Sequence, residues 1–302
     1  MDRISNLGQH QQLVSAMLRN QRELAEAQLQ VSTGKRGDSY DDLGGDAVRQ
    51  INLSHLLSRE TAYAENAGRA EAELAAQDLH VGQAYDAALA LKDAILNAIA
   101  AGEARGLASA AATGFDALRA AMNASVAGKP LFSGGVTGVE AFAPDSLAAL
   151  VALPAVADAF GAGGVPRKII VGDGRSVEVG MDAAMIGVPF ADALRTLGRL
   201  LPLDGPLDAA ASAALVALLP ELDAAAATLR DAQAETGARA ALTADISREA
   251  VARTTALQTA LSAVEDVDPA AAITRLQAEQ TALQASYQAF ARLADMTLLN
   301  FL

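Results

Sequence analysis

The sequence contains no cysteine and no tryptophan. Disulfides, thiolate nucleophiles and thiolate metal sites are therefore excluded, and thiol content gives no indication of the redox compartment. Aromatic residues make up only 4% of the 302 residues. About a quarter of the chain is alanine, which has the highest helix propensity but a side chain too small to fill a core well. This composition predicts long helices packed side by side around a thin core.

Basic residues are in the minority. There are 23 Lys and Arg against 36 Asp and Glu, which gives a formal charge of -13 and a sequence pI near 4.6. The basic residues are scattered rather than aligned in a stripe, so they offer no continuous surface for a phosphate backbone. We expect no nucleic-acid partner.

Long hydrophobic runs are also missing. Residues 1–12 are polar and do not form a secretory signal peptide, which needs a basic start followed by an apolar run. The stretch 147–164 is apolar but is interrupted by Pro154 and Asp158, so it falls short of the roughly 20 residues that span a bilayer. We expect no membrane insertion.

Candidates for enzyme chemistry are weak. The three histidines have no metal-ligand spacing, and Ser32-Thr33-Gly34-Lys35-Arg36 lacks the upstream glycine and strand of a phosphate-binding loop. The acidic residues of two short stretches are alternative cation ligands, although capping and solubility explain them more simply. We therefore predict no catalytic residue, no cofactor and no metal site. The histidines are His10, His55 and His80, and the acidic residues are Asp41, Asp42, Glu265, Asp266 and Asp268.

The periodicity, by contrast, is strongly helical. In the first 33 residues, apolar or small side chains recur at alternating steps of four and three, which is typical of one face of a coiled-coil helix. Ser32-Thr33-Gly34 ends this pattern, and Asp46 is the expected N-cap of the next helix, which runs to about Ala101. The second helix carries the same heptad at Tyr63, Ala67, Ala70, Leu74, Gln77, Val81, Ala84, Ala88, Leu91, Ile95 and Ala98.

A third helix is predicted over about 107–126, with Phe115, Leu118 and Met122 facing inward. Composition then changes, and strands at 167–171 and 175–179 flank Gly172-Asp173-Gly174, which predicts a hairpin. Helix returns from about 207 to 267. Asp268-Pro269 marks a new helix start, because Asp is a good N-cap and proline is favoured at the first helical position. A clear heptad follows to the end of the chain.

The predicted fold is mainly α: a long helical hairpin or coiled-coil bundle with paired N- and C-terminal helices and a small mixed α/β insert. Three domains are expected. Residues 1–35 with 268–302 form a terminal coiled coil, 36–130 with 206–267 form a long-helix bundle, and 131–205 form a small outward mixed domain.

The terminal heptads have two interpretations. They are either an internal core seam or a polymerisation surface, and the length of the helices favours the second, because long helices expose seams that other molecules must cover. If the terminal helices are antiparallel and Val31 lies near the level of Ala272, Asn20 is near Leu283, within about one helical turn of Gln280. The candidate assembly residues are Leu13, Met17, Asn20, Leu24, Ile273, Leu276, Gln280, Leu283, Tyr287 and Phe290.

Several segments resemble flagellins and flagellar hook-associated proteins. The resemblance lies in residues 28–36 (QLQVSTGKR) followed by Asp41-Asp42, in 131–135 (LFSGG), in 264–269 (VEDVDP), and in 283–290 (LQASYQAF) with the final Leu-Leu-Asn-Phe-Leu. It covers roughly residues 1–140 and 205–302. The Thr-Gly-Lys-Arg stretch and the Asn-Phe-Leu ending are more similar to hook-filament junction proteins (hook-associated protein 3) than to flagellin.

The resemblance implies a structural protein without catalytic activity, secreted by the flagellar type III apparatus into the bacterial flagellum. It implies terminal helices in an inner tube layer and self-assembly into a ring or helical layer. Implied partners are a neighbouring hook-associated protein, flagellin and an export chaperone on the C-terminal helix. The alternatives are flagellin itself and, from another class, a cytoplasmic helical adaptor or chaperone that uses its heptads to bind partner helices.

Overall fold

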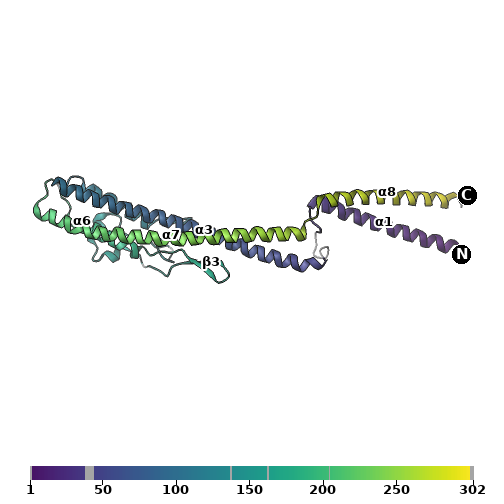
Figure 1. The fold of residues 1–302 in the computed structure, drawn as a ribbon, viewed down its shortest axis with the longest axis horizontal. Helices are drawn as coiled ribbons and strands as arrows, with labels where there is room; N and C mark the ends of the chain where they lie inside the picture. Colours follow the sequence, from purple (N-terminus) through teal and green to yellow (C-terminus); the bar gives the residue numbers. More distant parts are fainter. Residues whose placement is uncertain (1, 38–43, 137, 162, 204, 300–302) are drawn as a thin grey trace. The chain divides into compact units, whose positions relative to one another are not determined.

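The computed structural model describes residues 2–37, 44–136, 138–161, 163–203 and 205–299, and these are mainly helical with two small antiparallel sheets (Figure 1). The predicted fold class is confirmed. The elements are α1 (Asp2–Thr33), η1 (Gly44–Asp46), α3 (Ala47–Ala101), α4 (Leu107–Met122), β1 (Ser125–Val126), β2 (Lys129–Pro130), α5 (Leu147–Ala152), η2 (Val156–Ala159), β3 (Lys168–Gly172), β4 (Arg175–Glu178), α6 (Ala183–Leu200), α7 (Ala209–Glu265) and α8 (Pro269–Leu299).

The helix boundaries follow local chemistry. Gly34 ends α1 in the left-handed region, with φ 71°, where glycine lacks the steric cost of other residues. At the start of α8 the Asp268 carboxylate accepts a hydrogen bond from the Ala270 N–H at 2.9 Å, and Pro269 is the first helical residue. Both boundaries were predicted from the sequence and are confirmed.

The predicted end of the third helix at residue 126 is wrong, because α4 ends at Met122. The Asn123 side chain turns away from the helix and exchanges two hydrogen bonds with the backbone of Phe142, at 2.8 and 2.9 Å. Val126 then pairs with Lys129 in the short hairpin of β1 and β2. A side-chain bond to a residue 19 positions away thus competes with helix continuation, which the local pattern does not reveal.

The described chain divides into two compact units. Unit 1 consists of residues 1–59 and 253–302, and unit 2 consists of residues 60–252. The three-domain division expected from the sequence stays a prediction.

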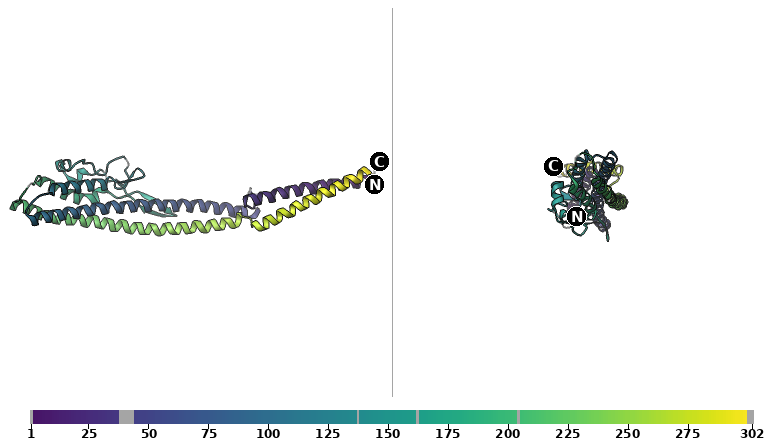
Figure 2. Two further views of the ribbon diagram at one scale, coloured as in Figure 1. Left: turned by 90° about the horizontal axis from the view of Figure 1, so that it is seen from above. Right: turned by 90° about the vertical axis from the view of Figure 1, so that its left-hand side faces the viewer.

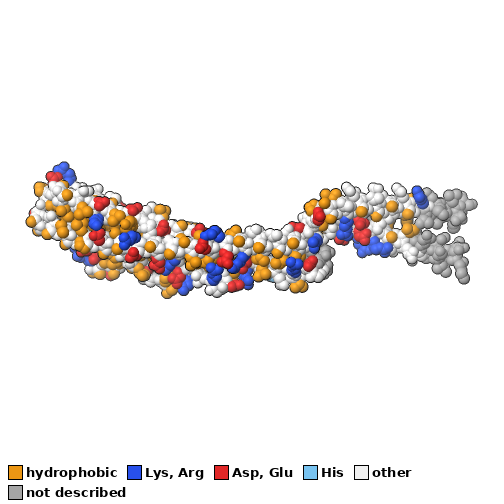
Figure 3. Space-filling model, in the orientation of Figure 1, with side chains coloured by type: hydrophobic (Ala, Val, Ile, Leu, Met, Phe, Trp, Pro, Cys, Tyr) orange, Lys and Arg blue, Asp and Glu red, His pale blue; other side chains and the backbone are white. Residues whose placement is uncertain are grey.

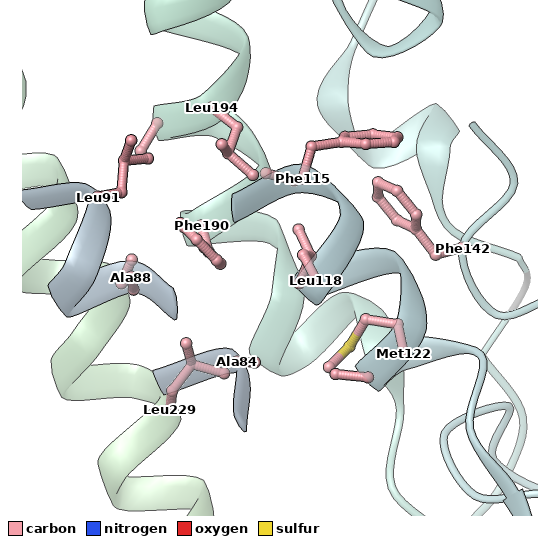
Figure 4. Packing of buried hydrophobic residues seen from close by; sticks show 14 of the residues in the cluster. Ala84, Ala88, Leu91, Phe115, Leu118, Met122, Phe142, Phe190, Leu194 and Leu229 are labelled. Atoms are coloured by element: carbon pink, nitrogen blue, oxygen red, sulfur yellow. The ribbon is translucent and has the colours of Figure 1, made fainter. Parts of the chain in front are cut away.

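The core of unit 2 is built on α3. Its predicted seam is confirmed from Ala67 to Ala98, where every predicted position is buried. Helices α4, α6 and α7 pack against this seam with larger side chains, as Figure 4 shows for Leu91 of α3, Phe115 of α4 and Phe190 of α6. The three predicted inward residues of α4, namely Phe115, Leu118 and Met122, are buried. The alanines of α3 therefore allow close approach, and the phenylalanines fill the space around them.

The predicted hairpin is confirmed as β3 and β4, which pair antiparallel with Ile169 opposite Val177. Its apolar face packs on α3 and α7 in a second buried cluster: Ala67, Ala70, Leu74, Val171, Val177, Val179 and Ile246. The Gln77 side-chain amide of α3 donates to the carbonyls of Leu131 and Val179, at 3.0 and 2.9 Å. This buried amide therefore ties two loop segments to the long helix.

Among the described helices, α7 is long and apolar enough to cross a membrane by length and composition, with a mean hydropathy of 1.5 in its most apolar window. Its apolar side chains Leu215, Leu218 and Leu222 are buried in the core of unit 2. The apolar stretch 147–164 contains only the short helix α5 and the 3-10 turn η2. The hydropathy of α7 is thus explained by its alanines and by a core-facing leucine row.

Candidate functional site

The two terminal helices α1 and α8 of unit 1 lie side by side and antiparallel (Figures 1 and 2). Glu26 lies within 3.6 Å of Arg275, and the Asn20 amide donates to the Ser286 hydroxyl at 2.7 Å. Residue numbers fall along α1 as they rise along α8, which fixes the antiparallel direction. The predicted pairing of the chain ends is therefore present.

This pair is thinly packed. In the parts of α1 and α8 whose side chains are described, those that are buried belong to Ala27, Gln30 and Ala272. A two-helix layer covers each seam from one side, and larger apolar side chains remain open to solvent. The pair therefore has apolar surface available for contact with other molecules.

The ten predicted assembly residues fall into two groups. The half-buried group consists of Leu13, Met17, Asn20, Leu24, Leu276, Leu283 and Phe290. The exposed group consists of Ile273, Gln280 and Tyr287. Tyr287 is 46% exposed and Ile273 is 48% exposed, so these side chains do not contribute to an internal seam. Their participation in an assembly surface stays a prediction.

The inward face of α8 differs from the predicted stripe at three positions. The inward residues are Ala272, Leu276, Glu279, Leu283, Ser286 and Phe290. Ala272, Glu279 and Ser286 thus take the places predicted for Ile273, Gln280 and Tyr287. Sequence reasoning chose the more apolar or larger neighbour in two of these cases, whereas the pair prefers small residues where helices approach closely.

The proposed pairing of Asn20 with Gln280 is not observed. Gln280 is exposed, and Asn20 instead bonds Ser286, three residues beyond the predicted level at Leu283. The adjacent Gln21 amide donates to the Tyr287 hydroxyl at 2.9 Å. A hydroxyl on the inward face thus satisfies the seam amide, because Ser286 faces α1 and Gln280 does not.

A cluster of hydrogen bonds joins the end of α1 to the junction of α7 and α8. We call the segments Gly34–Arg36 and Glu265–Val267 together the joint. Its backbone bonds run from the Arg36 N–H to the Glu265 carbonyl, 2.7 Å, and from the Val267 N–H to the Gly34 carbonyl, 2.9 Å. Lys35 Nζ donates to Glu265 Oε2 at 2.9 Å and to Asp266 Oδ1 at 2.7 Å.

Further side chains close around the joint. The Gln30 amide donates to the Arg36 carbonyl at 2.8 Å, and the Gln50 amide of α3 donates to Glu265 Oε1 at 2.7 Å. The Arg36 guanidinium donates to the Asp266 carbonyl at 3.2 Å. The ends of α1 and α7, the first turn of α3 and the link to α8 are therefore held by one polar network.

The network changes the acidity of its members. Hydrogen bonds from Gln50 and then Lys35 lower the pKa of Glu265 below its ordinary value. Hydrogen bonds from Lys35 and then Ser262 lower the pKa of Asp266. The same carboxylates, Asp266 first, raise the pKa of Lys35. All three groups are therefore held in their charged forms.

Sequence reasoning missed this network. It treated Glu265 and Asp266 as caps or cation ligands and Lys35 as a loop residue, and it did not join them. A signal was present, because the stretches 28–36 and 264–269 both carry the family resemblance, and the structure brings these two stretches together. The other proposed acidic pair, Asp41 and Asp42, lies outside the described residues.

The remaining chemical candidates have simpler explanations where they are described. No group of three or more His, Asp or Glu side chains suited to a metal ion occurs in the described parts of the chain. Asp268 caps α8, His55 is exposed, and His80 lies 3.0 Å from the Gln83 side chain. Lys35, the lysine of the Gly-Lys pair, is engaged by two carboxylates rather than exposed in a phosphate-binding loop.

Residues 219–302 match the family model for the bacterial flagellin C-terminal helical region. The match includes most of α7, the acidic side of the joint and α8. The resemblance to flagellins and flagellar hook-associated proteins is therefore confirmed, with the C-terminal part of the chain as its sequence-level support.

Two solved structures share the fold. A Vibrio parahaemolyticus protein described as a flagellar hook-associated protein has a TM-score of 0.58 at 18% identity, over 74% of this chain and 99% of that chain. FlgL from Bacillus cereus has a TM-score of 0.56 at 13% identity, over 70% of this chain and 99% of that chain. At these identities the likeness shows a common fold. A search of curated proteins finds no match.

Proposed function

We propose that this chain is a structural subunit of the bacterial flagellum that forms the hook-filament junction by helical self-assembly. The observation that carries the proposal is the exposed apolar surface of the α1–α8 pair, in a chain whose C-terminal region matches flagellin. Covering this surface with neighbouring subunits removes apolar area from water, which favours association. The fold shared with FlgL supports the junction over the filament.

The proposal includes the compartment and the partners. The protein is secreted, its terminal helices form an inner layer of a ring or helical tube, and it contacts a hook-associated protein on one side and flagellin on the other. Before export, a chaperone covers α8, where the exposed Ile273 and Tyr287 side chains offer it an apolar surface. Assembly rather than catalysis is its role.

Flagellin is the second candidate, because the family model that matches residues 219–302 is that of flagellin. The two candidates differ in copy number, since a junction needs a small fixed number of subunits and a filament needs very many. A cytoplasmic helical adaptor or chaperone is a weaker alternative and differs in location.

Fractionation separates the three candidates. Flagella sheared from cells are purified, and this protein is quantified against the hook protein in the same preparation. A low, constant ratio of this protein to the hook protein supports the junction, and a large excess of this protein over the hook protein supports flagellin. Absence from the sheared fraction, with the protein retained in the cytoplasm, contradicts both flagellar functions.

Replacing Leu283 and Phe290 together by Asp tests the assembly surface. Both side chains are half-buried on the inward face of α8, so covering the pair with neighbouring subunits would bury the new carboxylates further, and burial of an unpaired carboxylate is strongly unfavourable. We expect loss of incorporation into flagella, with the helix content of unit 2 unchanged by circular dichroism. The matched control replaces Leu79 and Leu242 by Asp, since these side chains of unit 2 are 59% and 58% exposed. Normal incorporation of the Leu283→Asp, Phe290→Asp variant contradicts the proposed surface.

A further inference from the structure

The α1–α8 pair does not fix its own register strongly. Its seam repeats every seven residues, so a slip of one heptad keeps the same face of each helix inward. On α8, large side chains recur on that face at intervals of seven, at Leu276, Leu283 and Phe290, so a slip of one heptad places one large apolar side chain where another was. The Asn20–Ser286 and Gln21–Tyr287 hydrogen bonds and the Glu26–Arg275 ion pair favour the observed register, but each is a weak preference at a partly exposed position.

The joint supplies what the seam lacks. It holds the segment that follows α1 against the link between α7 and α8 by two backbone hydrogen bonds, at 2.7 and 2.9 Å, and α8 begins two residues after this link at Pro269. When one end of an antiparallel pair is fixed, the other positions meet their partners at high effective concentration and in one register. Loosening of the joint allows α8 to slide or to separate from α1.

Lys35 is the side chain that closes the joint. Its ammonium group bridges two carboxylates from consecutive residues, Glu265 and Asp266, which stand 230 and 231 positions away in the sequence. The Lys35–Asp266 pair also forms an isolated backbone bridge. The side-chain charges of Lys35 and Asp266 therefore lie next to the backbone hydrogen bonds of the joint, which set the register of α1 against α8.

We propose that Lys35 is a positioning residue for the assembly surface: by bridging Glu265 and Asp266 it sets the register in which α1 pairs with α8. The role of the pair in assembly rests on the proposed function, whereas the effect of Lys35 on register is a property of the monomer. The three side chains are 44%, 19% and 42% exposed for Lys35, Glu265 and Asp266, so the effect is moderate rather than absolute.

The absence of cysteine permits a direct test, because introduced thiols are the only ones in the chain. Asn20→Cys with Ser286→Cys reports the observed register, and Asn20→Cys with Glu279→Cys reports the register slipped by one heptad, in which Glu279 replaces Ser286 on the inward face. Each pair is joined with a short bifunctional thiol reagent in dilute monomer, and the cross-linked fraction is measured over time. In the parent the first pair is expected to cross-link faster than the second.

Lys35→Met keeps the aliphatic stem and removes the charge. It is expected to slow cross-linking of the first pair by about two- to fivefold, the range of a partly exposed ion pair, and to raise the relative yield of the second pair. Lys35→Arg preserves the bridge and restores the parent rate. Lys129→Met, which removes an exposed lysine from unit 2, leaves the rate unchanged.

Removal of the two carboxylates should also slow the cross-linking of the first cysteine pair. Glu265→Gln with Asp266→Asn is expected to slow cross-linking as Lys35→Met does, and the combined triple variant is expected to be no slower than either, because coupled groups are non-additive. A parent-like rate in Lys35→Met overturns the proposal, as does an equal loss in Lys35→Arg or in Lys129→Met. Circular dichroism confirms that each variant keeps its helix content.

The consequence for assembly is measured separately. We expect Lys35→Met to reduce recovery of the protein in sheared flagella, and Lys35→Arg to restore it. If the parent itself is absent from flagella, the proposed function fails while the cross-linking result stands. If the parent assembles and Lys35→Met cross-links normally in the monomer, the proposed function stands and the role of Lys35 in register is overturned.

Discussion

At the scale of single residues, Ala127 has an unfavourable backbone. It lies in the turn between β1 and β2 with φ 49°, and Gly128 follows with φ 75°. Two consecutive positive φ angles are typical of a type I′ turn, for which Asn-Gly is the preferred pair. Ala127→Asn is therefore expected to stabilise unit 2 by about 0.5–1 kcal/mol, measured by urea unfolding. Ala120→Asn, in an exposed position of α4, is the control and should be neutral or destabilising, because Asn is a poorer helix former.

Gly163 is constrained by its surroundings, which leave no room for a side chain. A Cβ atom at this position would lie 1.9 Å from Asp182 Oδ2, and Asp182 caps α6 by accepting a hydrogen bond from the Ala184 N–H at 2.9 Å. Gly163→Ala is expected to displace the cap and lower the free energy of unfolding by about 1–3 kcal/mol. Gly68→Ala is the matched control. Gly68 lies within α3 with nothing within 4 Å of the added Cβ, so the same change there should stabilise the protein by about 0.5–1 kcal/mol.

At the scale of elements, the joint between α1, α7 and α8 should depend on pH. The charged groups that surround it in the described residues are Lys35, Arg36, Asp46, Glu265 and Asp266. The pKa values of Glu265 and Asp266 are lowered from 4.5 and 3.8, so their contribution to stability is present at neutral pH and is lost as pH falls through the lowered values. The pKa of Lys35 is raised from 10.5, so its contribution is complete below that value and is lost as pH rises through the raised one.

The measurement compares the parent with Lys35→Met by thermal unfolding. The difference in Tm between them is expected to be positive at pH 7 and to shrink as the pH falls through the lowered pKa values of Glu265 and Asp266, where both carboxylates become protonated. High salt at pH 7 should reduce the difference as well, since these groups are partly exposed. A Tm difference that stays unchanged as acidification protonates these carboxylates contradicts the assignment of the effect to the ion pairs.

Unit 2 and unit 1 differ in how they are stabilised. Unit 2 contains a core with four fully buried phenylalanines, Phe115, Phe132, Phe142 and Phe190, whereas the terminal pair of unit 1 buries mainly alanine. The face of the molecule drawn in Figure 3 carries hydrophobic and charged side chains next to one another. Local stability follows buried apolar area, so the ends of the monomer should open more readily than the middle.

Hydrogen exchange on the monomer tests this difference. We expect amides of α1 and α8 to exchange at least about tenfold faster than those of α4 and α6, because their opening exposes less apolar surface. Limited proteolysis should first cut within roughly residues 1–35 and 268–302 and leave a resistant middle. Equal protection of the terminal helices and of α4 in dilute monomer would contradict this expectation, and protection gained on assembly would support it.

Much of the fold was accessible from the sequence alone, because its signals are local. Every heptad position predicted on α3 from Ala67 to Ala98 is buried, and Glu73 is buried in addition, since an alanine-rich seam of this length leaves one face for packing. Gly34 and Asp268-Pro269 predicted helix boundaries because backbone conformation and capping depend on adjacent residues. The β3–β4 hairpin was predicted for the same reason, with glycines on both sides of its turn.

Contacts between distant segments were decided by the tertiary structure. Periodicity placed the seam of α8 to within one residue but did not select Ser286 over Gln280 as the partner of Asn20. The rotation of α8 against α1 decides this choice, because it turns Ser286 toward α1 and leaves Gln280 exposed. In the same way, α4 ends at Met122 because Phe142 bonds Asn123. The sequence by itself determined the helices, their seams and their ends, through forces that act within a few residues. Only the tertiary structure decided which polar groups meet, as Lys35 meets Glu265 and Asp266 across 230 and 231 positions, because hydrogen bonds between distant residues depend on how the packed helices are placed.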